Sequence, residues 1–141
     1  MWIITDLDGT LCDIRGRVDF ARDRDWDRFH EDIAADPVCK PVREVLHALS
    51  LVHHIAILTG RPDRYRTETL SWLNKSGVEW SRLLMREDGD RRPDYEVKLS
   101  TAHENGLTPE NVLLVLEDRD RMTQKWREFG YTCFQVAKGL Y

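Results

Sequence analysis

The sequence lacks any apolar run that approaches the roughly 20 residues needed to cross a bilayer. Its apolar start, Met1–Ile4, lasts four residues and is soon followed by Asp6, so it is too short for the hydrophobic region of a secretory signal peptide. We therefore expect neither a membrane span nor a cleaved leader. These absences predict a soluble, cytoplasmic protein with no membrane partner.

Cysteine is scarce, and its spacing suggests no pairing. The three residues, Cys12, Cys39 and Cys133, are odd in number, and none lies close to another in the sequence. This pattern argues against a disulfide framework and against a zinc site. We expect thiols that behave as small hydrophobic side chains.

The sequence also has no internal repeat, low-complexity tract or Pro/Gly-rich linker, and its 141 residues match the size of one ordinary domain. A single domain over residues 1–141 is the simplest interpretation. The net charge of −4 gives no general attraction for nucleic acid, so a phosphate-binding surface would have to be local. Arg-rich stretches at 61–66 and 82–92 could supply one, although such runs are usually solvated faces.

What the sequence does contain is an alternation of short apolar runs and helical patterns. Bounded runs of this length are typical of strands buried on both faces, and strands that alternate with helices predict a parallel sheet covered on both sides. The expected fold class is α/β: a Rossmann-like three-layer sandwich with a mainly parallel five-stranded sheet and no large cap domain. The expected strands are Trp2–Thr5, Ile55–Leu58, Leu83–Met85, Val112–Leu116 and Cys133–Val136, and the expected helices lie near 41–49, 65–73, 95–104 and 122–129.

The first predicted strand runs into a segment in which Asp6 and Asp8 precede Gly9. Ligands of parallel sheets sit at the carboxyl ends of the strands. Two carboxylates this close repel each other and raise each other's pKa unless a cation lies between them. Magnesium is the usual cation where phosphate is also bound, and Gly9 would let the backbone approach a ligand closely. An Asx-type turn is the structural alternative, but average residue usage makes Asp-x-Asp-Gly-Thr rare by chance.

Two further segments carry polar side chains that could bind phosphate. Thr59, Gly60 and Arg61 follow the second predicted strand, where a hydroxyl, free N–H groups and a guanidinium can bind a phosphoryl oxygen. Alone, such a segment is more often a turn. Lys98 lies in a helical segment, where a solvated lysine is the default. Both segments become candidate phosphate-binding sites because of where the expected fold places them.

Adjacent acids, Glu117 and Asp118, follow the fourth predicted strand. Such a pair at the end of a buried strand is costly without a cation, so Asp118 is a natural third metal ligand. The alternative is an acidic helix start, which the helix dipole favours.

Taken in order, these segments resemble the motifs of the haloacid dehalogenase-like phosphatases. Asp6–Thr10 matches the first motif, Thr59 the second, Lys98 the third, and Glu117 with Asp118 the fourth. Together they cover nearly the whole chain. The first motif is highly specific, and the other three are weak singly but strong in series.

Further segments are similar to the 3′-phosphatase domain of the bacteriophage polynucleotide kinase/phosphatase family. The Gly-x-x-x-x-Gly-Lys-Ser/Thr loop of the kinase half is missing, so the resemblance implies a lone phosphatase, which would work in the host cytoplasm if it is phage-encoded. Glu117 stands where the family leads us to expect Asp, so it is given a supporting role. The matching segments are Arg15–Arg17, Met85–Arg92, Asp94, Lys125–Gly130 and Cys133–Gly139.

The resemblance implies a Mg²⁺-dependent phosphomonoesterase that removes 3′-phosphate from DNA or RNA ends in repair. Asp6 would be the nucleophile that becomes a phospho-aspartate, and Asp8 would protonate the leaving oxygen and then activate water. Mg²⁺ would be held by Asp6, the main-chain carbonyl of Asp8, and Asp118. Thr59 and Lys98 would complete the cradle for the phosphoryl group.

The resemblance also assigns residues to the substrate. Arg17 and Arg61, with Gly60, would bind substrate phosphates, and Asp94 would support the site. Among the five tryptophans, Trp26 and Trp80 lie outside the predicted helical stripes. Either could stack on a base, although core packing is the more common role.

Two alternatives remain open at the level of sequence. A small-molecule or nucleotide phosphatase of the same superfamily would have the same active site and differ only around the leaving group. A signalling receiver domain, or an inert binding module, also combines acids, a threonine and a lysine on a parallel sheet. A receiver, however, carries its phosphorylated aspartate on a later strand and needs no acid two residues beyond it. Nothing in the sequence indicates the oligomeric state.

Overall fold

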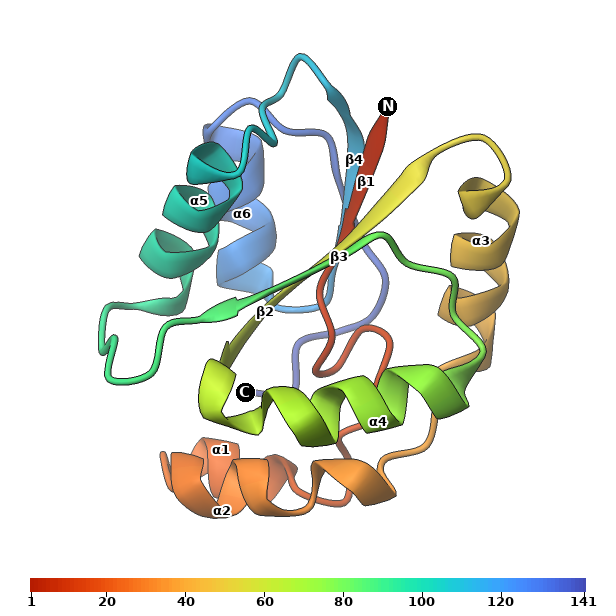
Figure 1. Ribbon diagram of the computed structural model, residues 1–141. Helices are drawn as coiled ribbons and strands as arrows, with labels where there is room; N and C mark the ends of the chain where they lie inside the picture. Colours follow the sequence, from red (N-terminus) through yellow and green to blue (C-terminus); the bar gives the residue numbers. More distant parts are fainter.

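The computed structural model describes all residues, 1–141, and confirms the predicted α/β sandwich. The strands are β1 (Trp2–Thr5), β2 (His54–Pro62), β3 (Arg82–Arg86), β4 (Val112–Glu117) and β5 (Cys133–Gln135); the helices are α1 (Val18–Arg22), α2 (Trp26–Glu31), α3 (Lys40–Ser50), α4 (Arg66–Ser76), α5 (Asp94–Glu104) and α6 (Asp120–Glu128), with 3-10 helices at Ile33–Ala35 and Asp63–Tyr65. The five strands form one parallel sheet in the order β3-β2-β1-β4-β5. Helices cover both of its faces (Figure 1).

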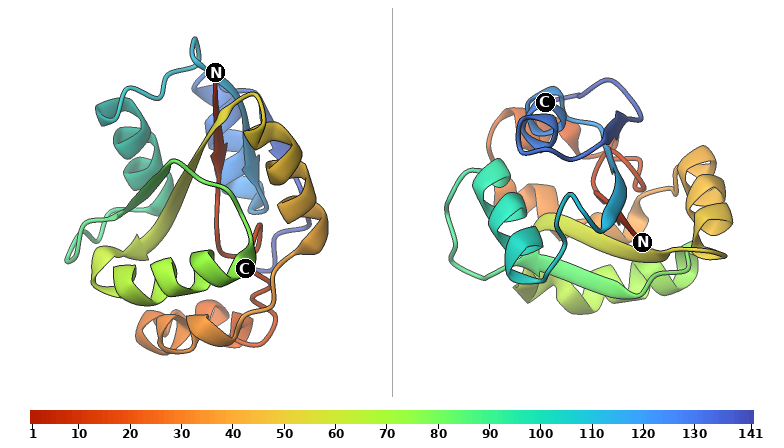
Figure 2. Two further views of the ribbon diagram at one scale, coloured as in Figure 1. Left: turned by 45° about the vertical axis from the view of Figure 1, so that its right-hand side comes forward. Right: turned by 90° about the horizontal axis from the view of Figure 1, so that it is seen from above.

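Two hydrophobic clusters separate the sheet from its two helical layers. Successive residues of a strand point to opposite faces, so Ile3 and Ile4 of β1 belong to different clusters. Ile3 packs with Leu46 of α3, whereas Ile4 packs with Ala102 of α5 and Trp126 of α6. Figure 2 shows the result: the gold helix α3 and the teal helix α5 lie on opposite sides of the sheet.

The central position of β1 decides where polar side chains gather. Thr5, its last residue, pairs with Ile57 of β2 and with Leu116 of β4. Because all the strands run in the same direction, the segments that follow these three residues emerge at one edge of the sheet. Asp6 therefore emerges there, between the ends of β2 and β4.

A helical insertion, residues 13–39, joins β1 to α3 and was not predicted from the sequence. It contains α1, α2 and the 3-10 helix Ile33–Ala35, and it lies beneath α4, at the end of the sheet where the loop after β1 emerges (Figure 1). The helices α1 and α2 span five and six residues, which is too short for a clear 3.6-residue pattern. The insertion is small, consistent with the expected absence of a large cap domain.

The other predicted elements are confirmed, with one difference at β2. Residues 59–62 were expected in a loop, but β2 continues to Pro62, with a shift of register against β3 between Thr59 and Pro62. Cys12, Cys39 and Cys133 are free thiols, as expected. None of the helices combines the length and the hydrophobicity that crossing a membrane requires.

Candidate active site

Three acidic side chains meet where β1 and β4 end. Oxygen atoms of Asp6, Glu117 and Asp118 lie within 4.8 Å of one another, and all three residues are buried. Lys98 reaches them from α5: its Nζ donates to Asp6 Oδ1 at 2.8 Å and to Glu117 Oε2 at 2.9 Å. Glu117 also fixes the start of the next turn, because its Oε1 accepts from the N–H of Asp118 at 3.1 Å.

The charges in this cluster do not balance. Three carboxylates face one ammonium group, which leaves two negative charges when all are ionised. Burial, with added repulsion from Glu117, raises the pKa of Asp6 to about 8. Burial and the charge of Asp6 raise the pKa of Asp118 to about 7. For Lys98, burial favours the neutral amine, but the surrounding carboxylates outweigh it and raise its pKa well above the usual value.

The residues of this cluster fit a hard divalent cation. Asp118 Oδ2 is buried and has no hydrogen-bond partner, while Thr10 Oγ1 donates to the other oxygen, Oδ1, at 3.1 Å. Gly9, with φ of +86°, lets the backbone pass so close that a Cβ there would lie 2.2 Å from Asp118 Oδ2. An all-oxygen site with two uncompensated negative charges suits Mg²⁺. Asp6 and Asp118 would hold the ion, with the main-chain carbonyl of Asp8 as a further oxygen ligand.

Asp8 lies in a different electrostatic environment from Asp6. Arg61 donates from Nε to Asp8 Oδ2 at 3.0 Å and from NH2 to Oδ1 at 2.6 Å, and Arg17 donates from NH2 to Oδ1. All three residues are buried. Burial alone would raise the pKa of Asp8, but the two guanidinium groups outweigh it and hold that pKa well below the usual range. Asp8 is therefore a carboxylate in the free protein.

The helical insertion holds Arg17 in place. Asp36 accepts from Arg17 Nε at 2.9 Å and from NH2 at 2.6 Å, and the carbonyl of Phe29 accepts from NH1 at 2.6 Å. The main-chain carbonyl of Asp36 in turn accepts from the indole N–H of Trp72 on α4 at 2.8 Å. Arg17 thus has every nitrogen of its guanidinium engaged by the protein.

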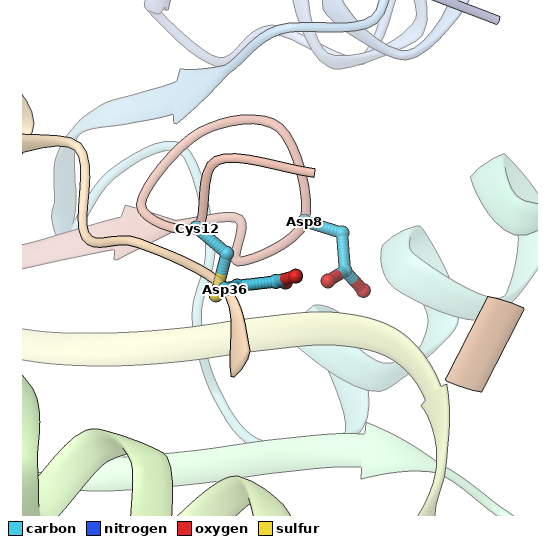
Figure 3. A group of neighbouring side chains, drawn as sticks. All are labelled: Asp8, Cys12 and Asp36. Atoms are coloured by element: carbon cyan, nitrogen blue, oxygen red, sulfur yellow. The ribbon is translucent and has the colours of Figure 1, made fainter. Parts of the chain in front are cut away.

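A second group of possible metal ligands, Asp8, Cys12 and Asp36, does not fit a cation. Their ligand atoms lie within 4.8 Å of one another, and in Figure 3 the carboxyl groups of Asp8 and Asp36 point toward each other beside the Cys12 thiol. Arg17 binds both carboxylates, and Arg61 donates to Cys12 Sγ at 3.5 Å. These two guanidinium groups already supply the positive charge.

Asp94 contacts both Lys98 and the backbone of Gly60. Asp94, the first residue of α5, lies 3.4 Å from Lys98, 3.5 Å from Arg86 and 3.3 Å from Arg119. A Cβ on Gly60 would lie 2.3 Å from Asp94 Oδ1, so only glycine lets β2 and α5 approach this closely. Burial would raise the pKa of Asp94, but its three cationic neighbours outweigh it and lower that pKa.

The structure thus brings the residues proposed from sequence into two linked groups. The two arginines make a different contact from the one expected. They were assigned to substrate phosphates, but both guanidinium groups are buried against Asp8 and bind its carboxylate. The first group contains Asp6, Asp94, Lys98, Glu117, Asp118 and Gly60; the second contains Asp8, Arg17, Arg61 and, through the N–H of Arg61, Thr59.

Sequence reasoning missed Asp36, Arg86 and Arg119. Asp36 is an isolated acid in a stretch without a regular pattern, so nothing in the sequence distinguishes it. Arg86 lies in an Arg-rich stretch that reads as solvated, yet its Nε donates to the carbonyl of Gly60 at 2.9 Å. Arg119 follows Glu117 and Asp118 directly, and that adjacency is the one signal that could have identified it.

The fold is similar to that of haloacid dehalogenase-like hydrolases. The structure of the L-2-haloacid dehalogenase of Xanthobacter autotrophicus matches with a TM-score of 0.67 at 15% identity, over 96% of this chain and 76% of that one. The chain belongs to the family of the polynucleotide kinase PNKP phosphatase domain, whose model matches residues 1–141. It is a phosphatase.

Two solved structures show a closer similarity. One is described as a Pnkp1/Rnl/Hen1 complex and the other as the Pnkp1/Rnl/Hen1 RNA repair complex. Both match with a TM-score of 0.86 at 30% identity over 99% of this chain. The match covers 46% and 43% of their chains, so the present chain spans less than half the length of these relatives.

Proposed function

We propose that this chain is a Mg²⁺-dependent phosphatase that removes 3′-phosphate from nucleic acid ends through a phospho-aspartate on Asp6. One observation carries the proposal. Asp6 is held by Lys98 on one oxygen and stands beside the unpartnered Oδ2 of Asp118, while Asp8, two residues on, is bound by two arginines. This arrangement pairs a nucleophile with an acid–base group.

Charge is the first obstacle to such a reaction, because a carboxylate must approach an anionic phosphate. Mg²⁺, when bound by Asp6, Asp118 and the carbonyl of Asp8, supplies the positive charge that offsets this repulsion. Lys98 contributes on the protein's side: its ammonium group lowers the pKa of Asp6 against the larger, opposite effect of burial, and it holds Asp6 in a fixed orientation through the contact at 2.8 Å. Glu117 and Asp94 in turn hold Lys98.

In the first step an oxygen of Asp6 attacks phosphorus in line with the 3′-oxygen. The bond from phosphorus to Asp6 forms as the bond to the 3′-oxygen breaks, and Asp8 gives the leaving oxygen a proton. Because Arg17 and Arg61 keep Asp8 ionised in the free protein, that proton reaches Asp8 from the substrate's phosphate monoanion. Thr59, together with the backbone of Gly60, borders the phosphoryl group.

In the second step Asp8 acts as a base. It takes a proton from water, whose oxygen attacks phosphorus and releases inorganic phosphate from Asp6. The two arginines favour the ionised form of Asp8 and fix its direction. We therefore assign Arg17 and Arg61 to the positioning of Asp8 for both steps.

The family supports a polynucleotide end as the substrate, and the two Pnkp1 relatives belong to complexes of which one is described as an RNA repair complex. The helical insertion is too small to enclose the site as a full cap domain would, and an open site suits a polymer end. A small-molecule or nucleotide phosphatase with the same chemistry is the second candidate.

The chemistry is tested with Asp6→Asn, which keeps the shape of the side chain but cannot form the acyl phosphate. Phosphate release should vanish, while the circular dichroism spectrum stays that of the wild type. After reaction with substrate that carries radiolabelled phosphate, acid-quenched wild type should retain label that hydroxylamine releases. Asp19→Asn, at an exposed acid, is the matched control. Turnover by Asp6→Asn, or full activity of the wild type in EDTA, would contradict the proposal.

The substrate class is tested by comparing phosphate release from a 3′-phosphorylated oligonucleotide, made as DNA and as RNA, with release from mononucleotides and sugar phosphates. We expect kcat/KM to be highest for the oligonucleotides. A preference for mononucleotides would remove the polynucleotide assignment and leave the phosphatase chemistry intact.

A further inference from the structure

The position of Asp8 identifies where the leaving group must lie. This inference rests on the proposed function, in which Asp8 protonates the 3′-oxygen. A general acid must stand within hydrogen-bond reach of the atom that it protonates, so the sugar and base attached to that oxygen lie against the protein surface next to Asp8. Arg17 borders Asp8 from the helical insertion.

Aromatic side chains lead outward from Asp8 along this insertion. The guanidinium carbon of Arg17 lies 4.3 Å from the ring centre of Phe29. Phe29 contacts the rings of Trp26 and Tyr141, with centroids 5.6 Å and 5.8 Å away, and the rings of Trp26 and Tyr141 lie 6.1 Å apart. Three rings thus form one continuous cluster, which we call the aromatic shelf.

The members of the aromatic shelf differ in exposure, and that difference is informative. Phe29 is 2% exposed and fills the interior of the insertion, whereas Trp26 is 45% exposed. Core packing therefore accounts for Phe29 but leaves about half of the Trp26 side chain facing solvent. This open aromatic surface, which is linked to Asp8 through Phe29 and Arg17, is available to stack on a planar group.

Tyr141 connects the aromatic shelf to Asp94 through Arg119. Arg119 lies over its ring, 4.6 Å from the centre, and also donates to Asp94 at 3.3 Å. Burial, and after it the negative charge of Asp8, raises the pKa of the Tyr141 phenol well above its usual value. Tyr141 is therefore linked, through Arg119 and Asp94, to Lys98.

We propose that Trp26, supported by Phe29 and Tyr141, stacks on the base of the nucleotide that carries the 3′-phosphate. Every base has an aromatic face, so stacking tolerates any sequence at the end. The charged side chains beside Trp26 are paired with one another: Asp25 caps α2 and pairs with Arg28, and Asp27 pairs with Arg64. We therefore assign to Trp26 a contact with the terminal base.

The test compares two substrates in two proteins. One substrate is an oligonucleotide with an ordinary 3′-terminal nucleotide; the other ends in an abasic sugar that carries the same 3′-phosphate. For the wild type we expect kcat/KM to be about tenfold lower with the abasic end, the size of a typical base–aromatic stacking contribution. In Trp26→Ala, kcat/KM for the ordinary end should fall to that of the abasic end, and the abasic end should be unaffected.

Trp26→Phe keeps an aromatic face against Phe29 and Tyr141, and it should retain most of the discrimination even if Trp26→Ala folds poorly. Phe129→Ala removes another exposed aromatic side chain, at the end of α6, and should change kcat/KM for neither substrate. An equal loss on both substrates in Trp26→Ala, or no loss on either, would overturn the stacking role while the 3′-phosphatase assignment stands. If the wild type releases phosphate from a simple alkyl phosphate but not from the oligonucleotide, the substrate assignment fails, and this inference fails with it.

Discussion

The acid cluster makes stability fall as the pH rises, and Mg²⁺ should oppose this fall. Burial raises the pKa of Asp6 from 3.8 to about 8 and that of Asp118 from 3.8 to about 7. A carboxyl whose pKa is higher in the folded state takes up a proton on folding. Its contribution to stability is therefore complete below about pH 4 and is lost as the pH rises through the folded pKa.

The size of the effect follows from these values. One pKa unit corresponds to about 1.4 kcal/mol, so the shift of Asp6 alone is on the order of 5 kcal/mol. The shift of Asp118 has partly the same origin, namely repulsion between the two groups, so the two are not additive. In EDTA we expect the free energy of unfolding to fall by several kcal/mol between pH 5 and pH 8. Mg²⁺ competes with protons for the same oxygens, so its stabilising effect should be larger at pH 8.

The assay is urea unfolding followed by tryptophan fluorescence at pH 5 and pH 8, with EDTA or with saturating Mg²⁺. A metal present at about 100 times its Kd stabilises by about 2.7 kcal/mol, which is readily measured. Asp118→Asn removes one buried charge, so in EDTA at pH 8 it should be more stable than the wild type and gain little from Mg²⁺. Asp19→Asn, at an exposed acid, is the control. The reasoning is refuted if Mg²⁺ stabilises the wild type equally at both pH values, or if Asp118→Asn is the less stable protein in EDTA.

Two further predictions concern Asp8. Because the arginines lower the pKa of Asp8, the proton for the leaving group comes from the phosphate monoanion, whose second pKa is about 6. At saturating Mg²⁺, kcat/KM should therefore decline above about pH 6. A rate that rises steadily to pH 9 would contradict the phosphate monoanion as the source of the proton. Arg61→Gln removes one of the two guanidinium groups, so kcat should fall on the order of 100-fold and the pH optimum should move upward as the pKa of Asp8 rises. Stability should fall by about 3–5 kcal/mol, since a buried ion pair is broken. The control is Arg64→Gln, at a more exposed arginine of the same segment, which should leave kcat, the pH optimum and the stability unchanged. An unaltered pH profile in Arg61→Gln would refute the positioning role.

Much of the fold and part of the site could be predicted from sequence because the relevant signals are local. Each buried strand is a short apolar run, and the acids of the cluster stand at the ends of such runs, as Asp6 and Asp118 do. Parallel strands end at one edge of the sheet, so the order of elements alone places these two residues together. The helices near 41–49 and 122–129 were equally clear, since their apolar residues recur with the helical period.

Other features could not be predicted because they depend on contacts between distant segments. Lys98 looks like any solvated helical lysine, yet it is buried by acids that come from two other elements. Arg17 and Arg61 are 44 positions apart in the printed sequence, and only folding shows that both bind Asp8. The helical insertion has no periodic pattern, so its part in holding Arg17 through Asp36 was invisible.

The sequence by itself determined the five strands, the four longer helices that alternate with them, and the presence of acids at the carboxyl edge of a parallel sheet, because apolar runs and the residues that end them are neighbours along the chain. Only the tertiary structure decided which charge each acid faces. Asp6 is buried among like charges and its pKa rises, whereas Asp8, two residues away, lies against two guanidinium groups and its pKa falls. Electrostatic interaction depends on distance in space and on burial, and neither is written in the spacing of residues along the chain.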